Sequence, residues 1–266
     1  MRIGLVLVGD ELLSGKRSDR HMPRTLELLH ARGLELDWVQ ILGDDLRLLS
    51  HHYARTLADG DIVLSFGGIG ATPDDRTRQA VAEAAGVELV LHPEAETILQ
   101  RKFGEDITPQ RLEMGRFPAG ARLIPNAWNG IPGFSFEHHH CVPGFPQMAW
   151  PMIEWVLDHH YPHLHQTDRQ QEFAVRVQGL GESRLIPLMH ELLRDHPQVR
   201  VSSLPHIEGD NGHIELGLRG LPEALTSARE AMLAGLRGLG IEWTEVTPPA
   251  NPTGSEPPLA DTGPRS

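Results

Sequence analysis

Short apolar runs alternate with longer amphipathic stretches over the first third of the chain. IGLVLV at 3–8 and DIVLSF at 61–66 are continuous apolar runs, the pattern of strands buried on both faces. Between them, the alternating stretch 35–42 predicts a third strand. Strands buried on both faces occur in parallel sheets that are covered by helices, so the pattern favours an α/β fold.

Helical spacing separates the predicted strands. Residues 21–33 carry apolar side chains on one helical face and end in a glycine suited to a helix C-terminus. Asp44 is placed to cap a second helix, and a third begins near Pro73 or Asp74 and ends at Gly86. Strand, helix, strand, helix, strand, helix predicts a parallel sheet with helices on both faces.

The pattern becomes looser after residue 86. Residues 92–103 are predicted to be helical, 122–125 to form a short strand and 126–134 to form a turn-rich loop. FEHHHCV at 136–142 is predicted to be one strand, followed by the turn PGFP and another helix. We expect residues 1–165 to form a three-layer domain with a mostly parallel sheet.

A second, smaller domain is predicted at residues 170–245. Its pattern reads strand, helix, strand, strand, helix, which is typical of a small α+β domain. The polar stretch at 162–170 is interpreted as a linker, and the proline-rich tail at 246–266 is predicted to be disordered.

Two glycine-containing stretches each follow a predicted strand. GDELLSG at 9–15 follows the first apolar run, and GGIGATPDDRT at 67–77 follows DIVLSF. Ligands of open parallel sheets bind beyond the carboxyl ends of the strands. We therefore expect both stretches to line one pocket.

The first half of GGIGATPDDRT has the properties of a phosphate-binding turn. Glycines let the main chain approach a ligand and adopt positive φ, and free N–H groups at a helix start favour a phosphate. The expected ligand-binding residues of this half are Gly67, Gly68, Gly70 and Ala71.

The second half of the same stretch holds two carboxylates, Asp74 and Asp75. Beside a phosphate site they would repel the anion unless a divalent cation bridges them or they act on a proton. The combination predicts a phosphorylated ligand with a divalent metal. In the alternative interpretation one aspartate only caps the following helix. Thr72 and Thr77 either contact phosphate or metal or act as caps.

GDELLSGK is a less specific stretch. Asp10 and Glu11 could bind a metal or hydroxyl groups, and Ser14, Gly15 and Lys16 could contact a phosphate. The two glycines are one residue too far apart for the phosphate-binding GxxxxGK[ST] pattern, and an arginine replaces its hydroxyl residue. We therefore reject a P-loop.

The run HHHC at 138–141 raises the question of a zinc site. On a strand His138 and His140 point to one face and His139 and Cys141 to the other, so at most two of them share a site. We interpret these imidazoles as pocket or surface residues and Cys141 as a small core residue. Adjacent histidines on predicted helices face apart and are expected on the surface, namely His51, His52, His159 and His160.

Charge and cysteine content exclude several classes of protein. The chain has 36 acidic and 24 basic residues and a net charge of -12, so it has no global field to attract nucleic acid or an anionic membrane. A single cysteine excludes an internal disulfide framework and fits a reducing compartment. No apolar run reaches membrane-spanning length, and the N-terminus lacks the long apolar region of a signal peptide. We expect a cytoplasmic protein.

Taken together, GDELLSG, GGIGATPDDRT, PNAWNGIPGF and VPGFPQM resemble the motifs of the competence/damage-inducible CinA family. The resemblance covers about residues 1–160 and implies the molybdopterin-binding fold that is shared with MoeA, MoaB and Mog proteins. It also implies that the small domain is similar to the KH-like domain that follows in CinA proteins. The C-terminal amidohydrolase domain of longer family members has no counterpart in this sequence, so its activity is not transferred.

The resemblance implies two different activities for the first domain. Some CinA first domains are similar to a metal-dependent pyrophosphatase that splits ADP-ribose into AMP and ribose 5-phosphate, whereas MoeA and Mog relatives bind molybdopterin or its adenylated form. The expected ligand is thus a phosphorylated pterin or nucleotide, with Mg²⁺, Mn²⁺ or Co²⁺. Asp75 and then Asp74 are the catalytic candidates, Asp10, Asp74 and Asp75 the metal candidates, and the N–H groups of 67–71 and Gly144 the candidates for binding phosphoryl oxygens.

The chain departs from the family pattern at several positions. Ala71 replaces a proline, Asn129 and Gly130 alter the third motif, and Met148 replaces a glutamate. The asparagines that follow the first motif are also missing, although Asp19 or His21 could substitute chemically. These changes favour a binding protein over a hydrolase. As in the family we expect a homo-oligomer, and we expect no RNA binding because GLGES at 179–183 carries a glutamate where a KH loop is basic.

Overall fold

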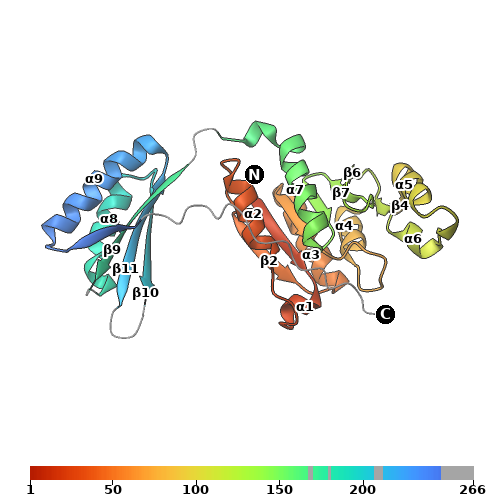
Figure 1. The fold of residues 1–266 in the computed structure, drawn as a ribbon, viewed down its shortest axis with the longest axis horizontal. Helices are drawn as coiled ribbons and strands as arrows, with labels where there is room; N and C mark the ends of the chain where they lie inside the picture. Colours follow the sequence, from red (N-terminus) through yellow and green to blue (C-terminus); the bar gives the residue numbers. More distant parts are fainter. Residues whose placement is uncertain (167–169, 179–180, 207–211, 247–266) are drawn as a thin grey trace. The chain divides into compact units, whose positions relative to one another are not determined.

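A six-stranded sheet with the strand order β2-β1-β3-β8-β7-β6 forms the centre of the first half of the molecule. The structure is a computed structural model that describes residues 1–166, 170–178, 181–206 and 212–246. It divides into two compact units, Met1–Gln166 and Thr167–Ser266 (Figure 1). Each unit has its own hydrophobic core.

Four neighbouring strands of the large sheet run parallel. They are β2 (Trp38–Leu42), β1 (Ile3–Val8), β3 (Ile62–Phe66) and β8 (His139–Val142). Every residue of β1, β3 and β8 is buried, which explains the mainly apolar sequences of β1 and β3. Two antiparallel strands, β7 (Gly133–Phe136) and β6 (Arg122–Ile124), extend the sheet on the side of β8.

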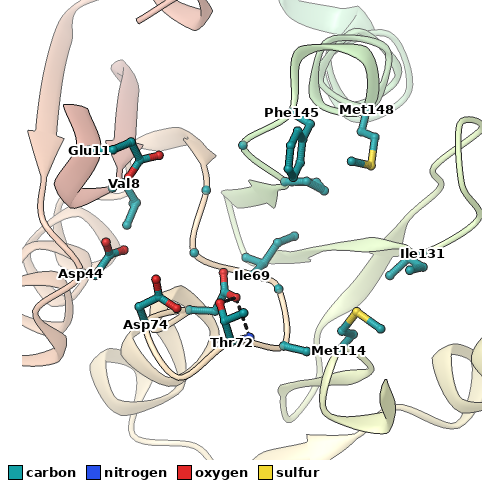
Figure 2. A pocket seen from close by; sticks show the side chains of 18 of the residues that line it. Val8, Glu11, Asp44, Ile69, Thr72, Asp74, Met114, Ile131, Phe145 and Met148 are labelled. Carbon is teal, nitrogen blue, oxygen red and sulfur yellow. Dashed lines mark hydrogen bonds between the residues drawn. The ribbon is translucent and has the colours of Figure 1, made fainter. Parts of the chain in front are cut away.

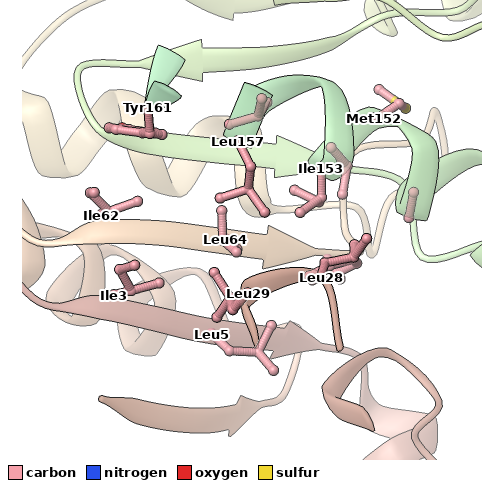
Figure 3. Close-up of a cluster of buried hydrophobic side chains, with 14 of the residues drawn as sticks. Ile3, Leu5, Leu28, Leu29, Ile62, Leu64, Met152, Ile153, Leu157 and Tyr161 are labelled. Atoms are coloured by element: carbon pink, nitrogen blue, oxygen red, sulfur yellow. The ribbon is translucent and has the colours of Figure 1, made fainter. Parts of the chain in front are cut away.

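Helices cover both faces of this sheet. On one face α2 (His21–His30) and α7 (Pro146–His160) pack on β1 and β3, as Figure 3 shows for the side chains of Leu29, Leu64 and Ile153. On the other face α3 (Leu46–Asp59) and α4 (Thr77–Ala85) enclose the second half of the core. The predicted three-layer α/β fold with a mostly parallel sheet is confirmed.

The remaining elements of the first unit are short. A two-stranded antiparallel sheet of β4 and β5 lies in the segment that also carries α5 and α6. The bounds are α1 Asp10–Leu13, β4 Leu89–Leu91, α5 Pro93–Phe103, α6 Pro109–Glu113 and β5 Arg116–Pro118. No helix among the described residues is both long and apolar enough to cross a membrane.

Three sequence predictions are corrected at the level of single elements. Asp45, not Asp44, caps α3, because its side chain accepts a hydrogen bond from the Leu48 N–H at 2.8 Å. Helix α4 begins only at Thr77, so the aspartates at 74 and 75 lie in the turn before it. The single strand predicted at 136–142 is two strands, since Glu137 adopts φ 50° in a turn between β7 and β8.

The second unit is a small α+β domain. Its antiparallel sheet has the order β10-β11-β9-β12, and α8 and α9 pack on it around a core of their own. The bounds are β9 Gln171–Gln178, α8 Ile186–Asp195, β10 Arg200–His206, β11 His213–Gly220, α9 Pro222–Gly238 and β12 Trp243–Val246. Strand β12 was not predicted, because it has only four residues and lies directly before the proline-rich tail.

Some predictions fall outside the described residues. These are part of the linker (167–169), the first two residues of the GLGES loop (179–180), most of the turn EGDNG (208–211) and the tail from 247 onward.

Histidine side chains lie on both faces of the sheet near the start of β8. His140 is fully buried and has Ser135 Oγ 2.8 Å from Nδ1 and the Tyr161 hydroxyl 2.7 Å from Nε2. His138 lies 3.1 Å from the same hydroxyl, so His138 and His140 do face one side. His139, on the other side, lies 2.7 Å from Thr56 Oγ1. Among the described residues no three His, Cys, Asp or Glu side chains are grouped to hold a metal.

The prediction that His52 lies on the surface is wrong, because its side chain is buried beside Trp38 and Tyr53. Burial disfavours the imidazolium form, and it lowers the pKa of His52 to about 4 and that of His139 to about 3. Burial also lowers the pKa of His140 well below its usual value.

These histidines predict acid sensitivity. In the unfolded chain these histidines have a pKa of about 6.5, which is above their pKa values in the folded protein. The unfolding free energy is therefore highest above about pH 6.5 and decreases as the pH falls toward the folded pKa values. At pH 5 the buried His139 alone lowers the unfolding free energy by about 2 kcal/mol relative to its value above pH 7. His139→Gln should flatten the dependence of the unfolding free energy on pH between 7.5 and 5, measured by urea denaturation.

His159→Gln is the matched control, because His159 is exposed on α7. It should leave the slope unchanged, and an unaltered slope in His139→Gln would contradict the assignment.

Candidate functional site

A cavity of about 510 Å³ opens at the carboxyl ends of β1, β3 and β8. Its floor is main chain from the glycine-rich turn after β3 and from the loop after β8. Figure 2 shows the carboxylates of Glu11, Asp44 and Asp74 on one side and Met114, Ile131, Phe145 and Met148 on the other. The cavity thus has one acidic wall and one apolar wall, which suits a ligand with a polar part and a ring.

The glycine-rich turn follows a path that only glycine permits. Gly67 and Gly68 have φ 100° and φ 68°, and a Cβ on Gly67 would lie 2.4 Å from the Val8 carbonyl oxygen. A Cβ on Gly68 would lie 2.3 Å from Thr77 Oγ1. That hydroxyl donates to the Gly67 carbonyl oxygen at 2.9 Å. Thr77 is fully buried and does not line the cavity, so it supports the turn from below instead of contacting a ligand directly.

Asp75 is hydrogen-bonded to the next part of the turn. Its Oδ2 accepts hydrogen bonds from the Thr72 N–H at 2.9 Å and from the Thr72 hydroxyl at 2.5 Å. A Cβ on Gly70 would lie 2.5 Å from the same oxygen. Asp75 therefore shapes the loop while it lines the cavity. Asp74 is exposed, and hydrogen bonding from Thr72 and from its own main chain lowers the pKa of its carboxyl.

A buried cation lies behind this turn. Arg78 is 2% exposed and donates to the Gly70 carbonyl oxygen at 2.5 Å and to the Glu113 carbonyl oxygen. Its Nε has no hydrogen-bond partner, and burial lowers the pKa of the guanidinium. Arg78 thus joins the turn to the end of α6, next to Met114 on the apolar wall.

The acidic wall is held together by main-chain hydrogen bonds. Asp44 Oδ2 accepts from the Asp10 N–H at 3.0 Å, and the Asp44 N–H donates to Asp10 Oδ1 at 3.2 Å. Burial raises the pKa of Asp44, and the charges of Asp10, Glu11 and Asp74 raise it further. A cation at this wall would relieve the repulsion.

The structure brings together only part of the residues predicted from the sequence. The cavity is lined by Gly67, Gly68, Gly70, Ala71, Thr72, Asp74, Asp75 and Gly144. Asp10, Ser14, Gly15 and Thr77 do not line it. Asp10 is directed to the Gly43–Asp44 turn, Ser14 donates weakly to the Glu11 carbonyl oxygen at 3.4 Å, and both side chains are exposed. Asp10, Asp74 and Asp75 therefore do not form a three-ligand metal set in this structure, consistent with the described residues holding no such group.

Several residues that line the cavity were not predicted. Asp44 follows β2 in a Gly-Asp pair like that after β1, and this repeated pair was the signal that could have found it. Arg17 contributes a positive charge at the rim and lies 3.7 Å from Glu11. On the apolar wall, Ile131, Phe145 and Met148 lie within the stretches PNAWNGIPGF and VPGFPQM, whereas Met114 follows α6 and has no recognisable pattern around it. There the Asn129 side-chain amide donates to Met148 Sδ at 3.1 Å.

Comparison with known proteins identifies the fold of the first unit. The family described as "Probable molybdopterin binding domain" matches residues 4–165. The chain belongs to this family. The resemblance to CinA proteins is also confirmed, and the cavity lies within the family domain.

Two relatives and one solved structure illustrate the likeness. A CinA-like protein of Anaeromyxobacter sp. (strain K) is 35% identical over 167 residues, which are 60% of this chain and 41% of the relative. A protein of Caldivirga maquilingensis is 29% identical over 258 residues, 93% of this chain and 99% of the relative. The crystal structure of the protein CinA with unknown function from Thermoplasma acidophilum matches with a TM-score of 0.54 and 26% identity, covering 59% of this chain and 98% of that one. The chain thus spans less than half of the CinA-like relative from Anaeromyxobacter.

The geometry of the turn predicts different costs for two glycine substitutions. Gly68→Ala and Gly86→Ala both place an alanine at nearly the same φ, 68° and 66°, but a Cβ meets Thr77 Oγ1 at position 68 and no atom within 4 Å at position 86. Gly86→Ala should cost about 1 kcal/mol for the left-handed conformation. Gly68→Ala should cost at least roughly 1 kcal/mol more because of the added collision, as measured by urea denaturation. Equal costs would show that the turn tolerates a Cβ.

Proposed function

We propose that the family domain binds a small phosphorylated molecule with a ring, a pterin or a nucleotide, at the carboxyl ends of the parallel strands. The observation that carries the proposal is the main chain of 67–72, which lines the cavity at a point where no side chain fits at Gly67 or Gly68. The N–H groups of Gly67 and Thr72 donate within the protein, to the Val142 carbonyl oxygen and to Asp75 Oδ2. The N–H groups of residues 68–71 are therefore the ones suited to phosphate oxygens.

The apolar wall supports a ring as the second part of the ligand. Phe145 is 56% exposed at the cavity, although aromatic side chains of this size are usually more buried. Met148 and Met114 lie on the same side. Methionine and phenylalanine adapt to flat ring systems, so this wall would take the pterin or base.

The charges around the cavity favour a divalent metal as a companion of the phosphate. Glu11, Asp44 and Asp74 would repel a free anion, and Arg17 and the buried Arg78 offset only part of this charge. Mg²⁺ is commonly held by one or two carboxylates together with phosphate oxygens, not by a protein cage. Asp44 and Asp74 are the carboxylates that would hold such an ion, Mg²⁺, Mn²⁺ or Co²⁺, and the ion would screen the phosphate charge.

The second candidate function is hydrolysis of ADP-ribose to AMP and ribose 5-phosphate. The carboxylates beside the phosphate-binding turn favour it, because hydrolysis of a diphosphate needs charge stabilisation and a base near the attacking water. Asp75, the leading catalytic candidate, is already engaged by Thr72, and Met148 stands where the family has a glutamate. We therefore place binding first.

Asp44→Asn separates a metal-assisted site from a metal-free one. Without metal, removing one negative charge should raise the affinity for ADP-ribose roughly three- to tenfold. With Mg²⁺ on the order of a few millimolar, the same variant should bind ADP-ribose several-fold more weakly than the unaltered protein. Isothermal titration calorimetry with and without Mg²⁺ measures both.

Glu105→Gln is the charge-matched control, since Glu105 is exposed and lies outside the cavity. It should change neither affinity. Failure to bind ADP-ribose, AMP and a pterin monophosphate under both conditions would overturn the proposal. Formation of AMP from ADP-ribose with Mg²⁺, Mn²⁺ or Co²⁺ would make hydrolysis the function.

We also propose that the protein acts as a homo-oligomer in the cytoplasm. The CinA resemblance supports the first statement, and a single, fully buried thiol supports the second, since it fits a reducing compartment. Light scattering of the purified chain measures the oligomeric state.

A further inference from the structure

His21, at the start of α2, lies between three elements that form the cavity. Its ring packs against Phe66, the last residue of β3, with ring centroids 4.5 Å apart. Its Nε2 lies 3.1 Å from the carbonyl oxygen of Gly144, in the loop after β8. Its Nδ1 lies 3.2 Å from Nε1 of Trp150 on α7. The side chain is only 8% exposed.

These partners require one protonation state of the imidazole. The indole N–H of Trp150 can only donate, so Nδ1 must carry a lone pair and accept. The Gly144 carbonyl oxygen can only accept, so Nε2 must carry the proton and donate. The neutral Nε2–H form therefore satisfies both bonds. The imidazolium form would point a second N–H at the Trp150 N–H.

The Gly144 loop that His21 holds is in contact with the glycine-rich turn. A Cβ on Gly144 would lie 3.5 Å from the Gly67 Cα, and the Gly67 N–H donates to the Val142 carbonyl oxygen at 2.9 Å. A movement of the loop after β8 would therefore displace Gly144 and the neighbouring Gly67, which both line the cavity.

We propose that His21 is a positioning residue that, when neutral, ties the Gly144 loop to Trp150 of α7. Protonation at Nδ1 breaks the link to Trp150 while the Nε2–H bond to Gly144 remains, so the loop shifts with the ring. The part that concerns ligand affinity rests on the proposed function, whereas the loop movement does not. The ligand site would then weaken in acid through one identifiable side chain.

The surroundings of His21 favour the neutral form. Burial lowers its pKa, and the positive charges of Arg17 and Arg20 act in the same direction, while Asp19 and the hydrogen bond to Gly144 oppose them. Arg24 of α2 lies over the Trp150 ring at 6.0 Å and pairs with Glu27. Phe66 of β3 adds no charge. His21 also lines a cavity of about 260 Å³ with Arg17, Asp19 and Glu11, which gives protons a way to the ring.

The first experiment uses the protein without ligand. The His21 imidazole and the main-chain amides of Gly67 and Gly144 are followed by NMR from pH 7.5 to 5. We expect the Gly144 and Gly67 amide shifts to titrate with the same midpoint as the His21 ring. Amide shifts that stay constant while the ring titrates would overturn the proposal.

Trp150→Phe tests the tautomer argument directly. It removes the donor that stabilises the neutral ring, so the midpoint of His21 and of both glycine amides should rise together by roughly 0.5–1 pH unit, the size expected for one hydrogen bond. Trp155→Phe is the matched control, because Trp155 lies on the same helix and packs against His159 and His160 instead. An unchanged midpoint in Trp150→Phe would contradict the proposed role.

His21→Gln tests rescue by a side chain that does not titrate. A glutamine amide can donate to Gly144 and accept from Trp150 at once, so the glycine amides should lose their pH dependence while the protein remains folded. His159→Gln should leave the pH dependence intact. Persistence of the titration in His21→Gln would assign it to another group and overturn the proposal.

A final measurement links the loop to the cavity. If ADP-ribose binds, its affinity should fall below the His21 midpoint in the unaltered protein and be less dependent on pH in His21→Gln. If ADP-ribose does not bind at any pH, the function proposed above fails while the NMR titration still decides the role of His21. Binding that falls identically in both proteins would overturn that role at the site.

Discussion

The close approach of main chain at the ends of β1, β3 and β8 is the constraint on which the site depends. Gly67 lies so near the Val8 carbonyl oxygen that a Cβ would come within 2.4 Å of it, and Gly144 approaches Gly67 from the other side. Parallel strands end at one edge of a sheet, but three of their loops can meet only if side chains are absent at the meeting point. The cavity floor is consequently made of main chain, and the functional side chains stand around it on Glu11, Asp44 and Asp74.

The main chain of this floor is held in place by side chains that do not line the cavity. Thr77 bonds to the Gly67 carbonyl oxygen, Arg78 to that of Gly70, and His21 faces that of Gly144. Each of these carbonyl oxygens is thereby occupied on the protein side. Main-chain carbonyl oxygens repel phosphate, so engaging them within the protein lets the N–H groups dominate the surface offered to an anion.

The fold and the family were accessible from the sequence because their signals are local. Uninterrupted apolar runs in β1 and β3 mark strands buried on both faces, and GGIGATPDDRT is long enough to be specific. The cavity was accessible only where it follows those motifs. Asp44 and Met114 reach it through the topology of the chain, and the burial of His52 depends on packing against Trp38 of a different element. The turn at Glu137 was hidden because an apolar and histidine-rich run gives no breaker residue.

Gly70 and Asp75 occupy one small volume, since the carboxylate oxygen of Asp75 fills the space where a side chain at position 70 would begin. Gly70 cannot gain a side chain while the Asp75 carboxylate keeps this position. A lineage that shortens or loses the aspartate first opens room for a larger residue at 70, whereas the reverse order passes through a collision. The two positions therefore have a preferred order of substitution, and related proteins that carry a larger residue at position 70 should lack the aspartate at position 75.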